Sequence, residues 1–172
     1  MRLSFWLLPS EPAKGKLQQL ITDLAGRFDA PVFAPHVTLY SGPLTETDRP
    51  NDALANVASR FAPLDLHSTG ISFSSQFTKT LFIEFALDDS LKQLSDALRG
   101  KATTPIDYEL KPHMSLIYAE LDEQSKRRLK EELFAPSVIR FDAIAAMISG
   151  ESTRTRTDVE NWKVSDEYRL AR

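Results

Sequence analysis

The first nine residues show an alternation of side chains with a period of two. This period is typical of a β-strand, because successive side chains of a strand point to opposite faces of a sheet. We therefore predict a first strand that Pro9 ends. One face of the strand would carry Leu3, Phe5 and Leu7, and the other face would carry Ser4, Trp6 and Leu8.

The next apolar residues recur at helical spacing, which predicts an amphipathic helix. They are Leu17, Leu20, Ile21, Leu24 and Phe28. The pattern then predicts a strand over 36–41, a helix over 48–61, a strand over 64–74 interrupted at Gly70, and a strand over 79–87. Asp88, Asp89 and Ser90 can cap a third helix that runs through Leu98.

The last third of the chain continues this pattern after a loop over 100–111. It predicts a strand over 113–118, a charged amphipathic helix over 122–133, and strands over 138–148 and 162–170. Residues 151–160 are polar and are expected to connect these two strands. In the final strand, Trp162 alternates with Val164, Tyr168 and Leu170 and is expected to lie in the core.

The order strand, helix, strand occurs twice along the chain. Trp6 lies 30 residues before His36, and Phe82 lies 31 residues before His113. Duplication of a half of about 80 residues explains both intervals. We therefore expect residues 1–172 to form a single α+β domain of two pseudo-symmetric lobes. Each lobe would be an antiparallel-rich sheet with helices on its outer face, and a cleft would separate the two sheets.

Composition narrows the classes of partner. The formal net charge of −3 and the pI near 5.6 argue against a protein that holds long nucleic acid through a broad basic surface. The absence of cysteine excludes a disulfide framework, a thiolate metal site and a cysteine nucleophile. The N-terminal apolar run is too short for a signal peptide, and no stretch reaches membrane-spanning length. We expect a soluble, cytoplasmic monomer, for which a small phosphate ligand remains possible.

One short motif occurs twice and contains two of the three histidines. Pro35 precedes His36-Val37-Thr38-Leu39, and 77 residues later Pro112 precedes His113-Met114-Ser115-Leu116. In a strand, residues i and i+2 lie on one face about 7 Å apart. Each copy is therefore expected to project an imidazole and a hydroxyl together from the start of a strand.

This pairing suits acid–base chemistry at a phosphodiester. Histidine titrates near neutrality, so one imidazole can accept a proton while the other donates one. The hydroxyls of Thr38 and Ser115 can donate hydrogen bonds to phosphate oxygens. We interpret His36 and His113 as the catalytic pair and Thr38 and Ser115 as phosphate-binding residues.

Other interpretations of the histidines remain open. Each could simply end a strand as a half-buried polar residue. A metal site would need His36, His113 and a carboxylate, but the chain lacks a typical ligand spacing, so no metal or other cofactor is expected. His67 has Thr69 at i+2 but no preceding proline, and we assign it a structural or surface role.

Four aromatic residues are candidates for substrate contact. Trp6 lies opposite the apolar stripe of the first strand, where it could stack on a base or pack between the lobes. Phe82 occupies the equivalent position in the second half, where a core role is the alternative. Tyr40 would share the face of His36, whereas Tyr118 would face the site only if its strand ends or twists immediately after Ile117.

At these residues the chain resembles the 2H phosphoesterase superfamily, and most closely its cyclic phosphodiesterase branch. The resemblance rests on both histidine motifs, their spacing, the N-terminal strand with Trp6 and the closing segment at Trp162. It implies hydrolysis of a small cyclic phosphodiester without a metal. The implied substrates are a nucleoside 2′,3′-cyclic phosphate, opened to the 2′-phosphate, or ADP-ribose 1″,2″-cyclic phosphate, opened to the 1″-phosphate. It also implies base stacking for Trp6 and a phosphate-directed aromatic at Tyr118.

Two alternative functions remain. The related RNA-ligase-like branch acts on 2′-5′ linkages and cyclic ends of RNA, but it usually carries an arginine soon after the second motif, where this chain has Ile117 and Tyr118. A non-catalytic module that binds nucleotide phosphates could use the same residues. Arg154 and Arg156 lie in the polar connection and are assigned no role.

Overall fold

The structure is a computed structural model that describes residues 1–171. The fold is α+β, as the sequence predicts, and its strands are antiparallel. The strands are β1 (Arg2–Pro9), β2 (Val37–Pro43), β3 (Leu64–Phe73), β4 (Leu81–Phe85), β5 (His113–Ile117), β6 (Val138–Ser149), β7 (Lys163–Val164) and β8 (Tyr168–Arg169). The helices are α1 (Ala13–Phe28), α2 (Pro50–Ala58), α3 (Asp89–Arg99), α4 (Glu123–Glu132) and α5 (Arg156–Glu160), with a 3₁₀ turn η1 (Phe77–Lys79).

The elements repeat in two halves of identical order. The first half runs β1-α1-β2-α2-β3, and the second runs β4-α3-β5-α4-β6. The strand order across the sheet is β2-β1-β6-β3-β4-β5, so β1 and β4 occupy matching positions, each next to an outer strand. Each histidine motif lies at the start of an outer strand, β2 in one half and β5 in the other.

Strands β3 and β6 join the two halves. Leu64 to His67 of β3 pair with β6, whereas Ser68 to Phe73 pair with β4. The pairing register shifts between Ser68 and Gly70, and Gly70 has a φ of +134°. That backbone conformation favours glycine, because a Cβ atom would be strained there. The interruption predicted at Gly70 is therefore the place where β3 leaves one part of the sheet for the other.

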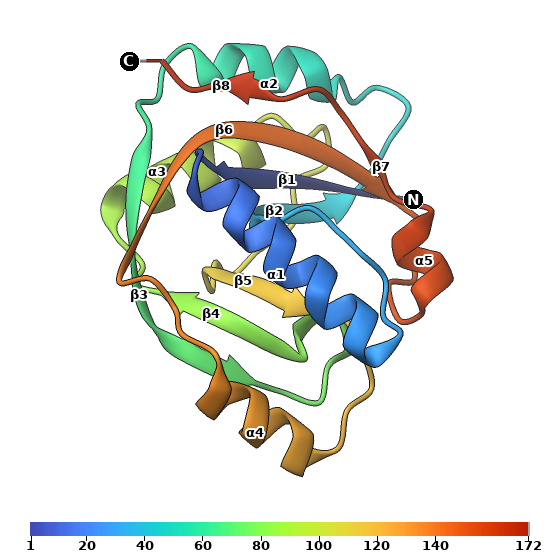
Figure 1. The fold of residues 1–172 in the computed structure, drawn as a ribbon. Coiled ribbons are helices and arrows are strands. Elements are labelled where there is room, and N and C mark those ends of the chain that lie inside the picture. The colour runs from blue at the N-terminus through green and yellow to red at the C-terminus, as the bar shows by residue number, and fades with distance from the viewer. Residues whose placement is uncertain (172) are drawn as a thin grey trace.

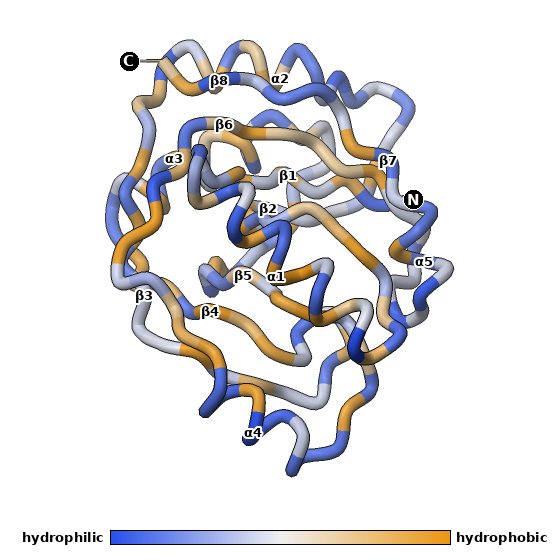
Figure 2. The backbone as a smooth tube through the Cα atoms, in the orientation of Figure 1, coloured by the Kyte–Doolittle hydropathy of each residue, from blue (hydrophilic) through white to orange (hydrophobic). Residues whose placement is uncertain are grey.

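The helices pack across the two halves as well as within them. Helix α1 contacts β5 of the second half in addition to β1, and α3 contacts β2 of the first half. Figure 1 shows α1 crossing in front of the strands, α2 above β6 and α4 at the far end beside β3. The tube through α1 changes between hydrophobic and hydrophilic segments along its length (Figure 2), as an amphipathic helix on a core requires.

The C-terminal segment differs from the prediction. The strand expected over 162–170 is two short strands, β7 and β8, and both pair with β6. The connection expected over 151–160 contains helix α5. Its start is a capping box, in which the Thr155 hydroxyl accepts from the Asp158 backbone N–H and the Asp158 carboxylate accepts from that of Thr155. The sequence Thr155-Arg156-Thr157-Asp158 carries this signal, which the polar composition of the segment obscures.

Candidate active site

A pocket of about 450 Å³ brings both histidine motifs together. It is lined from the first half by β1 and β2, and from the second half by β5 and the η1 turn. All four of the predicted catalytic and phosphate-binding residues line it: His36, Thr38, His113 and Ser115. Residues 77 positions apart in the chain therefore face one cavity.

The two imidazoles are held in the same way. His36 Nδ1 lies 2.7 Å from the carbonyl oxygen of Ala34, and His113 Nδ1 lies 2.8 Å from that of Lys111. A carbonyl can only accept, so each Nδ1 must carry the hydrogen. In a neutral imidazole this leaves Nε2 with its lone pair available. In each motif the carbonyl belongs to the residue before the proline, which is restricted to extended conformations and so fixes this carbonyl relative to the ring.

An aromatic ring supports each histidine. Trp6 stacks on His36, with ring centroids 3.7 Å apart and planes inclined by 12°. Phe82 meets His113 edge to face at 5.4 Å. Both aromatic rings are buried, with exposed fractions of 1% and 3%. Trp6 lines the pocket beneath the imidazole, whereas Phe82 is not among the residues that line it. In this structure both rings orient a histidine, and the substrate contact predicted for Phe82 has no support from its position.

Burial controls the protonation of the histidines. Desolvation lowers the pKa of His36 to about 4, and the positive charge of a protonated His113 contributes in the same direction. Desolvation also lowers the pKa of His113, where Lys79 lowers it further and Glu84 opposes the shift. Both imidazoles are consequently neutral at pH 7, and repulsion disfavours protonating both together.

The two hydroxyls differ in their hydrogen bonds. Ser115 Oγ donates to the carbonyl oxygen of Thr78 at 2.8 Å. Within residues 1–171, Thr38 Oγ1 has no protein hydrogen-bond partner, and its side chain is half-buried at the pocket. A phosphate oxygen could therefore accept from Thr38 directly, whereas Ser115 must first release the Thr78 carbonyl.

A bulge in each outer strand decides which tyrosine faces the pocket. Trp6 pairs with Thr38 and Phe5 with Tyr40, so Leu39 is an extra residue in β2. In β5 the extra residue is Leu116, because Phe82 pairs with Ser115 and Leu81 with Ile117. A bulge reverses the alternation of all later side chains. Five residues after each histidine, Ser41 and Tyr118 consequently line the pocket.

The placement predicted for Tyr40 is therefore wrong. Strict alternation puts Tyr40 on the face of His36, but the bulge at Leu39 turns it into the main core, where it is 0% exposed. Its hydroxyl accepts a hydrogen bond from the Ile106 backbone N–H at 3.3 Å.

The sequence places Tyr118 at the site only if its strand ends or twists immediately after Ile117. Strand β5 does end at Ile117, so this condition is met. Its ring stacks on Phe33 with centroids 3.7 Å apart, and it is 3% exposed. Burial raises the pKa of its hydroxyl, and a side-chain hydrogen bond with Ser115 opposes the shift. The phenol is thus neutral at the pocket and can act as a hydrogen-bond donor.

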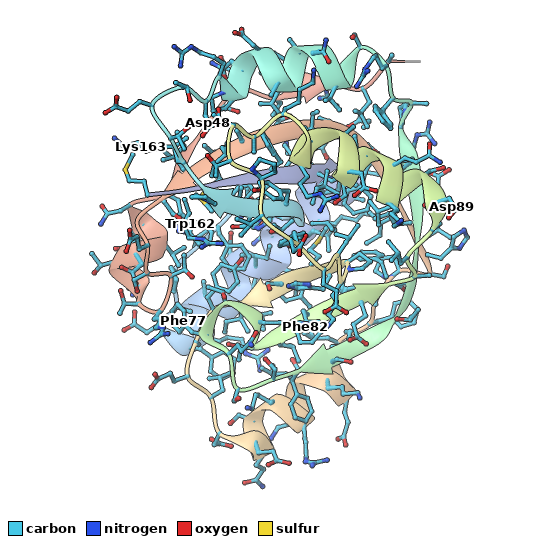
Figure 3. All side chains as sticks on the ribbon, turned by 180° about the vertical axis from the view of Figure 1, so that it is seen from behind. Asp48, Phe77, Phe82, Asp89, Trp162 and Lys163 are labelled. Atoms are coloured by element: carbon cyan, nitrogen blue, oxygen red, sulfur yellow. The ribbon has the colours of Figure 1, made fainter. Side chains whose placement is uncertain are left out.

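The structure also corrects the expectation for Trp162. This residue lines the pocket and meets Trp6, His36 and Tyr118 edge to face, with centroids 5.7, 6.5 and 5.7 Å away. Figure 3 shows Trp162 beside α5, on the same side of the molecule as Phe77. Because the expected strand is absent here, the period-two argument that placed Trp162 in the core does not apply.

The remaining lining residues are mostly polar and were not predicted. On β1 and β6 they include Arg2, Ser4 and Ser149. The alternation of the first strand could have revealed Arg2 and Ser4, since they share the face of Trp6. Arg154, given no role from sequence, lines the pocket, whereas Arg156 pairs with Asp29 and Glu160 away from it.

Several other features lie outside this pocket. His67 is exposed on β3 and does not line it. Within residues 1–171, no three His, Cys, Asp or Glu side chains gather in a way that could hold a metal ion. In the same part of the chain, every helix is too short or too polar to cross a membrane.

Comparison with known proteins agrees with this geometry. A family model described as "Cyclic phosphodiesterase-like protein" matches residues 1–170. The cyclic phosphodiesterase of Arabidopsis thaliana is 22% identical over 131 residues, which cover 76% of this chain and 72% of that protein.

Solved structures share the fold at low sequence identity. The protein TT0787 of Thermus thermophilus has a TM-score of 0.61 at 18% identity, covering 99% of this chain and 98% of that chain. E. coli LigT complexed with 3′-AMP has a TM-score of 0.59 at 15% identity, covering 99% of this chain and 98% of that chain. Together with the family match over nearly all residues, these findings show that the chain belongs to the cyclic phosphodiesterase-like family and is a phosphodiesterase.

Proposed function

We propose that the protein hydrolyses a small cyclic phosphodiester by acid–base catalysis from His36 and His113, without a metal. The observation that carries this proposal is the matched pair of imidazoles, each with Nδ1–H bonded to a carbonyl and with Nε2 left available, lining one pocket. Candidate substrates are nucleoside 2′,3′-cyclic phosphates and ADP-ribose 1″,2″-cyclic phosphate. The named complexes of LigT with 3′-AMP, ATP and phosphate support a nucleotide-type ligand.

The proposed step transfers two protons. One imidazole removes a proton from water as the water oxygen attacks phosphorus. The bond from phosphorus to one ribose oxygen breaks, and the second imidazole, which enters the step in its protonated form, gives its Nε2 proton to that oxygen as it leaves. The hydroxyls of Thr38, Ser115 and Tyr118 would donate to the non-bridging oxygens, whose negative charge increases in the transition state.

We assign the base role to His36 and the acid role to His113. His36 is the more deeply buried imidazole and is unprotonated over a wide pH range, since its pKa is about 4. His113 is half-buried, and Glu84 favours its charged form. Protonated His113 and neutral His36 are therefore the more accessible combination of charges.

The first test is the replacement of each histidine. Both His36→Ala and His113→Ala should abolish turnover of a 2′,3′-cyclic nucleotide followed by phosphorus NMR, a loss of about 100-fold to 10,000-fold. His67→Ala is the matched control and should retain wild-type turnover, because His67 is exposed outside the pocket. Addition of a chelator should leave the wild-type rate unchanged. Full activity in either alanine variant of the pair would exclude the mechanism.

The second test separates acid from base. A phosphodiester whose leaving group is nitrophenolate needs little protonation of that group. His113→Ala should therefore lose much less activity on this diester than on the cyclic nucleotide, while His36→Ala loses similar activity on both. The reverse pattern would exchange the two roles.

The main alternative within this family is action on the cyclic ends of RNA. Comparison of a mononucleotide cyclic phosphate with an oligonucleotide that ends in one separates the two substrates. The formal net charge of −3 favours the small substrate, because long RNA is usually held by a broad basic surface. Tight binding of nucleotides with no product from any of these diesters would instead identify a non-catalytic binding module.

A further inference from the structure

The pocket extends from the histidines along β1 into a second polar region that the proposed step does not use. Arg2, Ser4 and Trp6 share one face of β1 and all line the pocket. Four residues along a strand span about 13 Å, so Arg2 lies toward the other end of the pocket from the Trp6–His36 stack. We call Arg2, Ser4 and Ser41 the Arg2 subsite.

Hydrogen bonds hold the Arg2 subsite together. Arg2 Nη2 donates to Ser41 Oγ at 3.1 Å, and Ser4 Oγ donates to the same atom at 2.9 Å. Because Ser41 Oγ accepts both bonds, its own hydrogen remains available for a ligand in the pocket. Ser41 reaches this face only through the bulge at Leu39.

The charges around the pocket favour an anion. Three cationic side chains line it, Arg2, Lys79 and Arg154, against one carboxylate, Glu151, although the whole chain is acidic. Within residues 1–171, Arg2 has no carboxylate within 4.0 Å. Glu151 is fully exposed and lies 4.0 Å from the N-terminal ammonium group. A half-buried guanidinium without an anionic partner is thus left at the pocket.

The two halves of the protein differ at this position. Phe82 matches Trp6, and the residue four places before Phe82 is Thr78, where β1 has Arg2. Thr78 lies in η1, and its carbonyl accepts from Ser115. At the matching position the second half therefore has the neutral Thr78, whereas the first half has a cation; the cation of the same turn, Lys79, lies over the Phe82 ring at 4.5 Å. The two ends of an otherwise pseudo-symmetric pocket therefore differ in the residue at this position.

We propose that the Arg2 subsite binds a second phosphate group of the substrate, with Arg2 as a specificity-determining residue. The inference rests on the proposed function and narrows its substrate class to cyclic phosphodiesters that carry another phosphate or a pyrophosphate. The planar guanidinium matches two phosphate oxygens, and the Ser41 hydroxyl supplies a further donor. A 5′-phosphate, the pyrophosphate of an ADP-ribose derivative and the next phosphodiester of an RNA end share this chemistry.

The decisive test measures binding of reaction products, so that it does not depend on turnover. Adenosine 2′-monophosphate and adenosine 2′,5′-bisphosphate differ by one phosphate. By isothermal titration calorimetry, the wild-type protein should bind the bisphosphate at least about tenfold more tightly, as expected for charge-assisted hydrogen bonds. Arg2→Gln should bring the two affinities close together, and Arg2→Lys should restore part of the difference.

The matched control removes the same charge elsewhere. Arg128 is exposed on α4 outside the pocket, so Arg128→Gln should keep the wild-type ratio of affinities. Equal affinity of the wild-type protein for the two ligands, or an equal loss in Arg128→Gln and Arg2→Gln, would overturn the proposal. If Arg2→Gln fails to fold, the wild-type ratio and its decrease in Arg2→Lys decide the outcome.

Turnover assays then identify the source of the second phosphate. The substrates are adenosine 2′,3′-cyclic phosphate, its 5′-phosphorylated form, ADP-ribose 1″,2″-cyclic phosphate and a dinucleotide that ends in a cyclic phosphate. The last three should have the higher kcat/KM, and Arg2→Gln should reduce their advantage mainly by raising KM. Lack of turnover of all four would overturn the proposed function, while the binding result would still test the subsite.

Discussion

At the level of single residues, the burial of His36 makes the stability of the folded protein depend on pH. The folded protein holds this imidazole with a pKa of about 4, against 6.5 when it is free. Between these values the unfolded chain binds a proton that the folded chain does not, so acid favours unfolding. This destabilisation by acid is absent above pH 6.5 and builds up as the pH falls from 6.5 to 4. Its size is about 3 kcal/mol, from 1.36 kcal/mol per pKa unit.

His36→Gln should reduce this decline, because glutamine does not titrate. We expect urea unfolding of the wild-type protein at several pH values to show a loss of stability between pH 6.5 and 4 that is smaller in the variant. Because the pKa of His113 is also lowered, both proteins should still lose some stability as the pH falls. His67→Gln, at an exposed position, should retain the wild-type slope. Identical slopes for His36→Gln and the wild-type protein would contradict the burial argument.

Tyr118 provides a second test at this scale. Tyr118→Phe keeps the ring that stacks on Phe33 and removes only the hydroxyl beside Ser115. We expect kcat to fall by up to about tenfold, the range of one neutral hydrogen bond, with little change in the melting temperature. Wild-type kcat in this variant would show that the hydroxyl does not contact the reacting phosphate.

At the level of elements, the bulge in β2 determines the composition of the pocket. It turns the Tyr40 side chain into the core, so that the ring lies over Gly42. A Cβ added to Gly42 would lie 2.1 Å from the Tyr40 hydroxyl oxygen. Gly42→Ala should therefore destabilise the protein by about 1–3 kcal/mol, the usual cost of overpacking. Denaturant unfolding measures this change.

Two variants control this prediction. Gly26 lies within α1, and a Cβ there meets no atom within 4 Å, so Gly26→Ala should stabilise the protein by about 0.5–1 kcal/mol. Adding Tyr40→Phe to Gly42→Ala should recover part of the loss, since it removes the atom of closest approach. A Gly42→Ala protein as stable as the wild type would show that β2 can relax around the tyrosine.

At the level of the whole molecule, neither half is complete without the other. Helix α1 packs on β5 and α3 on β2, and β6 lies between β1 and β3. We propose that an internal duplication produced the two halves, a view supported by their identical element order and their matching bulges. Their helices now cover one another's strands.

A fragment of residues 1–75 should consequently fail to fold alone. It would keep β1 and β2 but lose β6, which pairs with β1 along most of its length, and lose the β5 surface under α1. We expect a circular dichroism spectrum of an unfolded chain with no cooperative transition in urea. Cooperative unfolding of the fragment would instead show that one half is an independent folding unit.

The amino-acid sequence by itself determined the local features of this protein. Periodicity located β1, α1 and the strands of both motifs, because burial on one face imposes a pattern that adjacent residues display. The repeated Pro-His-x-Ser/Thr-Leu predicted a shared site for His36, Thr38, His113 and Ser115, and all four line one pocket; the prediction was possible because each motif is contained within five residues.

Tertiary structure alone decided what depends on contacts between distant segments. Ser41 rather than Tyr40 faces the pocket because of the way β2 pairs with β1. Trp162 lies at the pocket because the segment before it forms α5. The fold also places Arg2 and Thr78 at matching positions of the two halves of the pocket, although they lie far apart in the chain. Alternation predicts the face of a side chain only while the register is unbroken, and a bulge that forms between two strands leaves no mark in either sequence.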